Sequence, residues 1–583
     1  MNTFTGTLYH LFASANKTHI VWCAAVLIIM LLLAVIHHFG KNDEKKIRLW
    51  RFLCAVPLII CAVHEWIYVY GVTDLLIWFV PMYLIGILAL LPVPFAKRKT
   101  GYRIAASAAG IMSVLCGLVF CVMSPDRSNH VRESYTDSFH ALVREMDENY
   151  ILKEWKEADL GALEAKYMPA VREAEQEQDP AKFVEAVTLF CNELHDGHIT
   201  VNGGYDKSVY RSETDLKTHE YGLAMVQLDS GDIIAVCTTE EVNRLGIEDG
   251  TVITGWGGKP VAQALAEDVP DPGYPVKANA DRVAAIYLSG IGGETVGVSF
   301  LDKSGTERTV TLTDLGKMHT RKEALCAFRS RPDTTDDEAL EEYRGQNFGT
   351  KMLTDKCGYL KLQSMMLNYD IFSFQHIMCY LTGDRSYARE LFREKLLGLK
   401  AQGMEYLVID LRNNTGGFDE FGASLCELLT ADDWPAERLG VRENGQYIAA
   451  YENDIRGTGE FAGLQVVALT NFRCISAGDT AALYLSRLPN VTLAGITDPD
   501  GSAQGTGGFC LLSDCIVSVE YPISLCLDET GAPNVDTRAD RISRDPVEVR
   551  IPLGYDAAMR IFRDKEDYEL DWAVQYLERN AER

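Results

Sequence analysis

The chain has 583 residues, of which 47% are hydrophobic and 24% are charged, and its formal net charge is −26. This length and composition indicate a globular protein of several domains and exclude a disordered or repetitive chain. Residues 1–124 hold ten Lys or Arg and four Asp or Glu, so the remainder is more acidic than the total. Such an acidic part argues against nucleic acid as a partner, because nucleic-acid binding favours cations that neutralise phosphates.

Residues 1–124 contain four apolar runs, each near the roughly 20 residues that span a bilayer core. These runs are 19–39, 52–72, 74–95 and 104–123. The loops 41–51 and 97–103 are rich in Lys and Arg, whereas 70–74 has none. Because positive loops stay in the cytoplasm, the pattern predicts a multi-pass cell-membrane protein whose large C-terminal part is extracytoplasmic.

After a short linker, helical periodicity runs from Tyr135 to about Leu194 and ends at the turn HDGHITV, 195–201. A β-rich segment follows at about 215–316, and its last two alternating runs form a hairpin around DKSGT. The order of its glycine-containing runs resembles a PDZ domain with an insertion at 269–286. In PDZ domains a peptide tail adds as a strand in a groove.

From Gly358 onward, expected strands and helices alternate, which predicts a mostly parallel sheet with crossover helices. The expected strands include YLVIDLR (406–412), VVALT (466–470) and VTLAGI (491–496), and the expected helices are 420–430, 476–488 and about 565–580. Ser476 stands at the turn from VVALT into the next helix. Backbone N–H groups at a helix start can stabilise an oxyanion, so Ser476 is a candidate nucleophile. An ordinary N-cap serine is the alternative.

Four motifs occur in a fixed order along the chain. They are LHDGH (194–198), YLVIDLRNNTGG (406–417), ISAGD (475–479) and AGITDPDGSAQGTGG (494–508). With the helical block and the PDZ-like segment, they make residues 135–580 resemble the C-terminal processing (tail-specific) and tricorn-core group of serine peptidases. The resemblance implies an α/β crotonase-like core behind a PDZ domain.

The predicted fold class is therefore an α/β crotonase-like peptidase core with a β-rich PDZ-like domain, an α-helical N-terminal block and four transmembrane helices. The domain boundaries are 1–124 for the membrane anchor, 125–201 for the helical block, 210–318 for the PDZ-like domain and 319–583 for the peptidase core.

The resemblance also implies roles for particular residues. Ser476, three residues before Asp479, matches the nucleophile, and the backbone N–H groups of Ala477 and of Gly416 or Gly417 match the oxyanion donors. Family members of the serine–lysine type carry a lysine where this chain has Gln504, in SAQGT. Glutamine cannot accept a proton from serine, so that form of dyad is excluded.

The tricorn-like branch uses a histidine after the helical block, and His198 matches it. Imidazole, with an ordinary pKa near 6.5, suits proton transfer near neutral pH. His195 is nearby but fits the pattern less well, and a structural turn histidine is the alternative for His198. Candidates for the acid that orients the ring are Asp196, Asp536 and Asp540, each of which also fits a solvated turn carboxylate.

No HExxH motif and no paired Cys/His spacing occurs, so no metal and no cofactor is expected. The sequence predicts a membrane-anchored, extracytoplasmic serine endopeptidase that cleaves polypeptides through an acyl-enzyme, with the substrate C-terminus presented to the PDZ-like groove. The alternative is a catalytically inactive pseudopeptidase that binds peptides or envelope proteins. The missing lysine and Gly197, which cannot orient His198, motivate that alternative.

Overall fold

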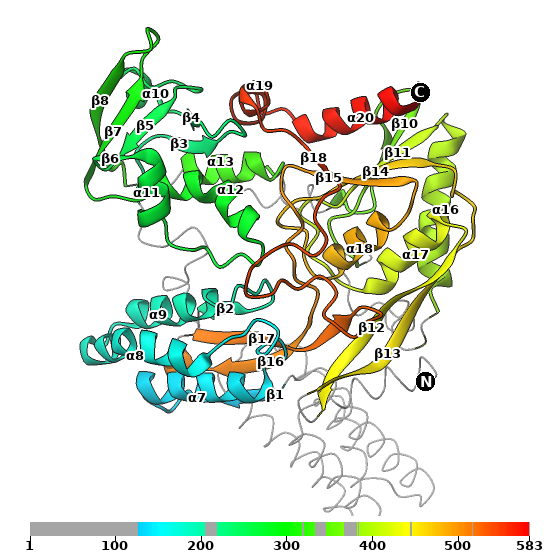
Figure 1. The fold of residues 1–583 in the computed structure, drawn as a ribbon, viewed down its shortest axis with the longest axis horizontal. Helices are drawn as coiled ribbons and strands as arrows, with labels where there is room; N and C mark the ends of the chain where they lie inside the picture. Colours follow the sequence, from blue (N-terminus) through cyan, green and yellow to red (C-terminus); the bar gives the residue numbers. More distant parts are fainter. Residues whose placement is uncertain are drawn as a thin grey trace, which may run out of the picture.

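The computed structural model describes residues 126–203, 219–316, 320–332, 345–366, 382, 384–443, 446–515 and 517–581 (Figure 1). Two larger sheets and two smaller ones organise this part of the chain. The helical block, drawn in blue and cyan, lies against the strands β16 (Gly505–Leu511) and β17 (Val517–Leu527) (Figure 1). Three of the four sequence motifs lie in the α/β core, and the fourth, at 194–198, follows the last helix of the block.

Three helices form the block, and each starts behind a side-chain oxygen that caps free backbone N–H groups. They are α7 (Tyr135–Asn149), α8 (Leu160–Glu177) and α9 (Pro180–Asn192). The caps are Ser134, Asp159 and Asp179. Their apolar faces share one hydrophobic cluster with Cys510, Val517 and Val519 of the neighbouring strands. The block therefore packs directly on the core.

The strands that flank the block, β1 (Asp126–Asn129) and β2 (Thr200–Gly203), belong to a six-stranded sheet whose other four strands come from the C-terminal part of the chain. These four are β16, β17, β12 (Asp433–Glu443) and β13 (Gln446–Arg456). β1 pairs with β16 in parallel, and β2 pairs with β17 antiparallel. This pairing places the turn at 195–199, just before β2, beside the core. The predicted domain boundaries stay predictions.

The β-rich segment contains a two-stranded sheet and a four-stranded antiparallel sheet in the order β6-β5-β7-β8. Its elements are β3 (Ala224–Gln227), β4 (Ile233–Val236), α10 (Glu240–Asn243), β5 (Ile253–Trp256), β6 (Lys259–Pro260), α11 (Val261–Asp268), α12 (Lys277–Leu288), β7 (Thr295–Leu301) and β8 (Glu307–Thr313). The expected hairpin around DKSGT joins β7 to β8. Most of α12 lies in the stretch predicted to be an insertion. The PDZ-like identity of the segment stays a prediction.

The core sheet has the order β18-β15-β14-β11-β10-β9, and only its edge strand β9 is antiparallel to its neighbour. The strands are β9 (Thr350–Met352), β10 (Cys357–Lys361), β11 (Tyr406–Asp410), β14 (Gln465–Leu469), β15 (Val491–Gly495) and β18 (Val549–Arg550). Successive side chains of a strand point to opposite faces. Accordingly, Leu407 and Ile409 join one hydrophobic cluster, and Tyr406 and Val408 join another.

Helices cover both faces of this sheet (Figure 1). α16 (Ser386–Ala401), α17 (Asp419–Leu429) and α18 (Ala477–Ser486) contribute to the cluster of Leu407. α13 (Thr320–Phe328), α19 (Tyr555–Ala558), the adjoining π-helical turn at Met559–Arg563 and α20 (Tyr568–Ala581) contribute to the cluster of Val408. Because β11, β14 and β15 are parallel, the turns that follow them meet at one edge of the sheet. The motif residues that follow β11, β14 and β15 lie at that edge.

The predicted fold class needs a correction in its membrane part. It included four transmembrane helices, and among the residues that the structure describes no helix has the length and apolar character needed to cross a bilayer. The apolar runs 19–39, 52–72, 74–95 and 104–123 themselves lie outside the described residues. The fold seen in the structure is one of mixed sheets and helices.

Candidate active site

Ser476 occupies the sharp turn between β14 and α18. Its backbone has a φ of 62° and a ψ of −132°, a combination that is strained for a residue with a side chain. Ser476 is the N-cap residue of α18, yet its side chain makes no capping hydrogen bond. Its backbone N–H donates to the Ser502 carbonyl at 2.8 Å, and its own carbonyl accepts from Thr480 at 3.0 Å. A strained serine with an unused hydroxyl on a strand-to-helix turn is the arrangement of a nucleophile.

The two glycines of the motif at 406–417 have different surroundings. The Gly416 N–H donates to the Asn414 Oδ1 at 2.9 Å and is therefore occupied. In the part of the chain that the structure describes, the N–H groups of Gly417 and Ala477 have no acceptor. Gly417 is exposed, and Ala477 is the first residue of α18. The geometry favours Gly417 and Ala477 as oxyanion donors, whereas Gly416 allows close approach to Ser476.

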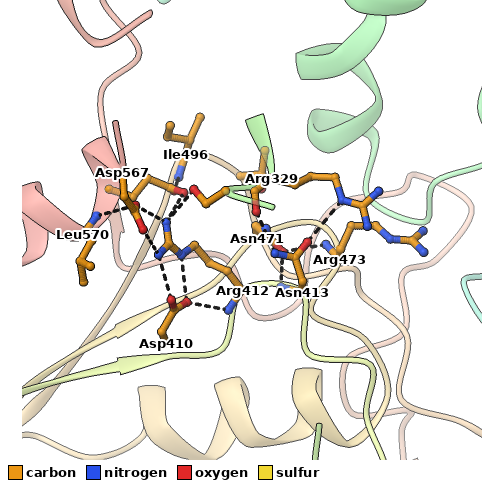
Figure 2. Close-up of polar contacts among 12 residues, drawn as sticks. Arg329, Asp410, Arg412, Asn413, Asn471, Arg473, Ile496, Asp567 and Leu570 are labelled. Carbon is orange, nitrogen blue, oxygen red and sulfur yellow. Dashed lines mark hydrogen bonds and ion pairs between the residues drawn. The ribbon is translucent and has the colours of Figure 1, made fainter. Parts of the chain in front are cut away.

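Two asparagines tie the oxyanion turn to the nucleophile turn. The Asn414 carbonyl accepts from the Ile475 N–H at 3.0 Å. The Asn471 Oδ1 accepts from the N–H groups of Asn413 at 3.0 Å and Arg473 at 3.1 Å (Figure 2). The sequence analysis did not single out either asparagine. The signal was available for Asn471, since it is a polar residue directly after the expected strand 466–470.

Arg412 holds the end of β11 through ion pairs (Figure 2). It is buried and pairs with Asp410 at 2.8 Å, Asp567 at 2.7 Å and Glu569 at 3.2 Å. Burial raises the pKa of Asp410, but the Arg412 guanidinium outweighs it and brings this pKa down to about 2. The ion pairs connect the strand before the oxyanion turn to the last helix, α20.

His198 lies buried in the turn before β2. Its backbone N–H donates to the Asp196 Oδ1 at 2.9 Å. Burial lowers the pKa of His198, and the Asp196 carboxylate partly opposes this effect. The imidazole is therefore neutral near neutral pH, which is the state that a general base requires.

Ser502 joins the histidine turn to the nucleophile turn. Its Oγ accepts from the Gly197 N–H at 2.9 Å, while its carbonyl accepts from the Ser476 N–H. Ser502 thus contacts both Ser476 and the residue before His198. No hydrogen bond joins the His198 ring to the Ser476 hydroxyl in this structure. Catalytic hydrogen bonds are often long before substrate binds, so this geometry leaves both roles as predictions.

The three candidate acids lie in different places. Asp196 contacts the His198 turn directly and is the carboxylate that acts on the pKa of His198. Asp536 is fully buried, and burial together with Asp196 raises its pKa well above the ordinary value. Asp540 is exposed and accepts from the Ile542 N–H at 3.2 Å, as a turn carboxylate does. The His195 ring faces Asp271 at 3.2 Å.

Lys156 and Asp479 are buried charged residues to which the sequence analysis gave no role. The Lys156 ammonium donates to the carbonyls of His195 at 2.8 Å and Thr537 at 3.2 Å. Burial lowers the pKa of Lys156, and nearby carboxylates, Asp196 foremost, oppose this. The Asp479 Oδ2 accepts from the N–H groups of Gly501 and Ser502. Their contacts join distant segments, so the sequence pattern, which used Asp479 only to place Ser476, predicted none of these contacts. No group of described His, Cys, Asp and Glu residues could hold a metal ion.

Residues 356–533, which include both the oxyanion turn and Ser476, match the family model of peptidase family S41. The chain carries a peptidase S41 domain. The predicted resemblance to this peptidase group is confirmed, and the chain is a serine-type peptidase whose class of substrate is the polypeptide. A comparison with curated proteins finds no match.

Solved structures similar to this chain have low sequence identity. Mature CPAF complexed with lactacystin has 13% identity over 74% of this chain and 96% of its own, with a TM-score of 0.47. The photosystem II D1 C-terminal processing protease has 16% identity over 75% and 98%, with a TM-score of 0.31. The tricorn protease has 14% identity over 77% and 37%, with a TM-score of 0.34.

Proposed function

We propose that the chain is a serine endopeptidase in which Ser476 attacks the scissile carbonyl and His198 takes the hydroxyl proton. The N–H groups of Gly417 and Ala477 would hold the oxyanion of the tetrahedral intermediate. Its collapse gives an acyl-enzyme and an amine, which receives the proton from His198. Water then hydrolyses the ester, again with His198 as base, and restores Ser476.

The conformation of Ser476 carries this proposal. Backbone strain of about 1–3 kcal/mol persists only where the surroundings impose it, and such strain concentrates at active sites. Here the turn is held by the Ser502 carbonyl and the Asn414 carbonyl, which accept from the N–H groups of Ser476 and Ile475. If Ser476 served only as an N-cap, its Oγ would accept from the first turn of α18, and it does not.

The test is labelling of the full-length protein with a fluorophosphonate, which reacts with activated serines. Ser476→Ala should abolish labelling, and His198→Ala should slow it at least about 100-fold. Ser486→Ala, at the other end of α18, and His195→Ala, whose ring faces Asp271, are matched controls that should label like the wild type.

Each other outcome is informative. Undiminished labelling of Ser476→Ala would remove the nucleophile, and undiminished labelling of His198→Ala would place the base elsewhere. A folded wild type without any labelling would favour the non-catalytic, peptide-binding alternative.

We also propose that residues 210–318 capture the C-terminus of the polypeptide as a PDZ-like groove would. The support is the order of strands and glycine-containing turns in this segment. A substrate peptide with an amidated C-terminus should then be cleaved more slowly than the free acid. Equal cleavage of both peptides would contradict this role. The predicted extracytoplasmic location depends on residues 1–124, outside the described residues, and stays a prediction.

A further inference from the structure

Two buried polar atoms, one on the proposed base and one on a neighbouring side chain, lack a hydrogen-bond partner. They are the His198 Nδ1 and the Gln504 Oε1, and neither has a partner in the described part of the chain. Leaving such an atom unpaired in a buried site destabilises the folded chain. The Gln504 side chain lies near enough to act on the His198 ring as a hydrogen-bonding group. The simplest way to satisfy both atoms is to pair them.

We propose that Gln504 is a positioning residue for His198. Its Oε1 accepts a hydrogen bond from the His198 Nδ1–H, which leaves Nε2 unprotonated for the transfer from Ser476. The inference rests on the proposed function and adds the group that selects the tautomer of the base. Gln504 stands where related peptidases carry a lysine, so this position would hold the base in place here without being the base itself.

The orientation of the Gln504 amide follows from its other contact. Its Nε2 donates to the Asp196 Oδ1 at 3.0 Å. A carboxylate only accepts hydrogen bonds, so the NH₂ end must face Asp196. The oxygen end is then the one left for the imidazole, and an oxygen can accept only from a protonated Nδ1. The amide therefore selects one of the two neutral tautomers.

Asp196 makes no hydrogen bond to the His198 Nδ1 in this structure, and its oxygens accept three other hydrogen bonds. Oδ1 accepts from the His198 backbone and from Gln504, and Oδ2 accepts from the Tyr150 hydroxyl at 2.7 Å. The resulting chain runs from Tyr150 through Asp196 and Gln504 to His198, and all four residues are buried. A neutral acceptor next to the ring fixes the tautomer while stabilising the imidazolium less than a carboxylate would.

The first test compares the pH dependence of fluorophosphonate labelling for three variants of the full-length protein. Gln504→Leu keeps the volume but cannot accept, so its maximal rate should fall about 10- to 100-fold and its acid midpoint should move to lower pH. Gln504→Glu can still accept from Nδ1 and can share a proton with Asp196. It should recover much of the rate and move the midpoint to higher pH.

Asn490→Leu is the matched control, because Asn490 is also a buried amide but donates to the carbonyls of Leu429 and Leu464. It should lower the melting temperature without moving the midpoint. Equal midpoints in wild type, Gln504→Leu and Gln504→Glu would overturn the role of Gln504 while leaving Ser476 and His198 in theirs.

The second test reads the tautomer directly. Full-length protein with ¹⁵N-labelled histidine should show His198, assigned through its loss in His198→Asn, as the Nδ1–H tautomer. Gln504→Leu should show a mixture or the Nε2–H form. An Nε2–H ring in the wild type would overturn the proposal. This measurement needs no activity, so a failure of the proposed function and a failure of this inference give different results.

Discussion

Gly416 lies in direct contact with Ser476: a Cβ built on the glycine would stand 2.5 Å from the Ser476 Cβ and 3.0 Å from its Oγ. Gly416 also has a φ of 80°, a conformation that L side chains rarely adopt. The nucleophile turn and the oxyanion turn are thus close together only because this residue has no side chain.

Gly416→Ala should therefore push the two turns apart. We expect fluorophosphonate labelling to fall at least about 100-fold, since a displacement of about 1 Å at an active site can have this effect. Gly463→Ala is the control, because a Cβ there meets nothing within 4 Å. The rate of labelling and the far-UV circular dichroism spectrum measure both variants. Normal labelling of Gly416→Ala would contradict the assigned contact.

Ser502→Ala should loosen the His198 turn. The Gly197 N–H loses its acceptor, which costs about 1–3 kcal/mol if the site stays buried. The Ser476 N–H keeps its partner, because that partner is the backbone carbonyl of residue 502. We expect labelling to slow about tenfold, as the base is less well placed. Ser138→Ala, whose hydroxyl bonds only the Tyr135 carbonyl of its own helix region, should label normally.

Asp545→Asn should change how stability depends on pH. Asp479 and Asp545 are buried together, and burial raises both pKa values, that of Asp545 to about 7. A carboxyl whose folded pKa is raised contributes stability at low pH that is lost as the pH rises towards and through that value. The wild type should therefore lose unfolding free energy between pH 5 and pH 8.

In Asp545→Asn this loss should be smaller by at least about 1 kcal/mol, because asparagine has no proton to lose. Urea denaturation at the two pH values measures the difference. Asp540→Asn, at an exposed turn, should behave like the wild type. An unchanged pH dependence in Asp545→Asn would show that the pair does not hold a proton near neutral pH.

Arg412→Lys should destabilise the attachment of α20 to β11. Lysine cannot make the paired contacts that the guanidinium makes with Asp410 and Asp567, and the carboxylates would stay buried. We expect a loss of about 3 kcal/mol in the free energy of unfolding. Arg244→Lys, at an exposed pair with Glu240, should cost less than about 1 kcal/mol. Equal effects of the two substitutions in chemical denaturation would contradict the assignment.

The sequence predicted most of the core elements because their signals are local. Buried runs mark β11 and β14, and a helical pattern after Ser476 marks α18, within a few residues of their observed bounds. The hairpin of β12 and β13 was missed, although the Asn-Gly pair between its strands is a known hairpin signal. Its strands mix charged and apolar residues, so no clear alternation marked them.

By itself, the sequence determined the resemblance to this group of peptidases, the serine turn as the candidate nucleophile and the glycine pair as candidate oxyanion donors, since these depend on neighbouring residues in a motif. Only the tertiary structure decided that the Gly416 N–H is occupied, that Asp196 contacts the His198 turn and that Gln504 lies beside Asp196. Those outcomes depend on which residues from distant segments are buried together. Burial and hydrogen-bond partners are properties of the packed chain, and no spacing along the sequence encodes them.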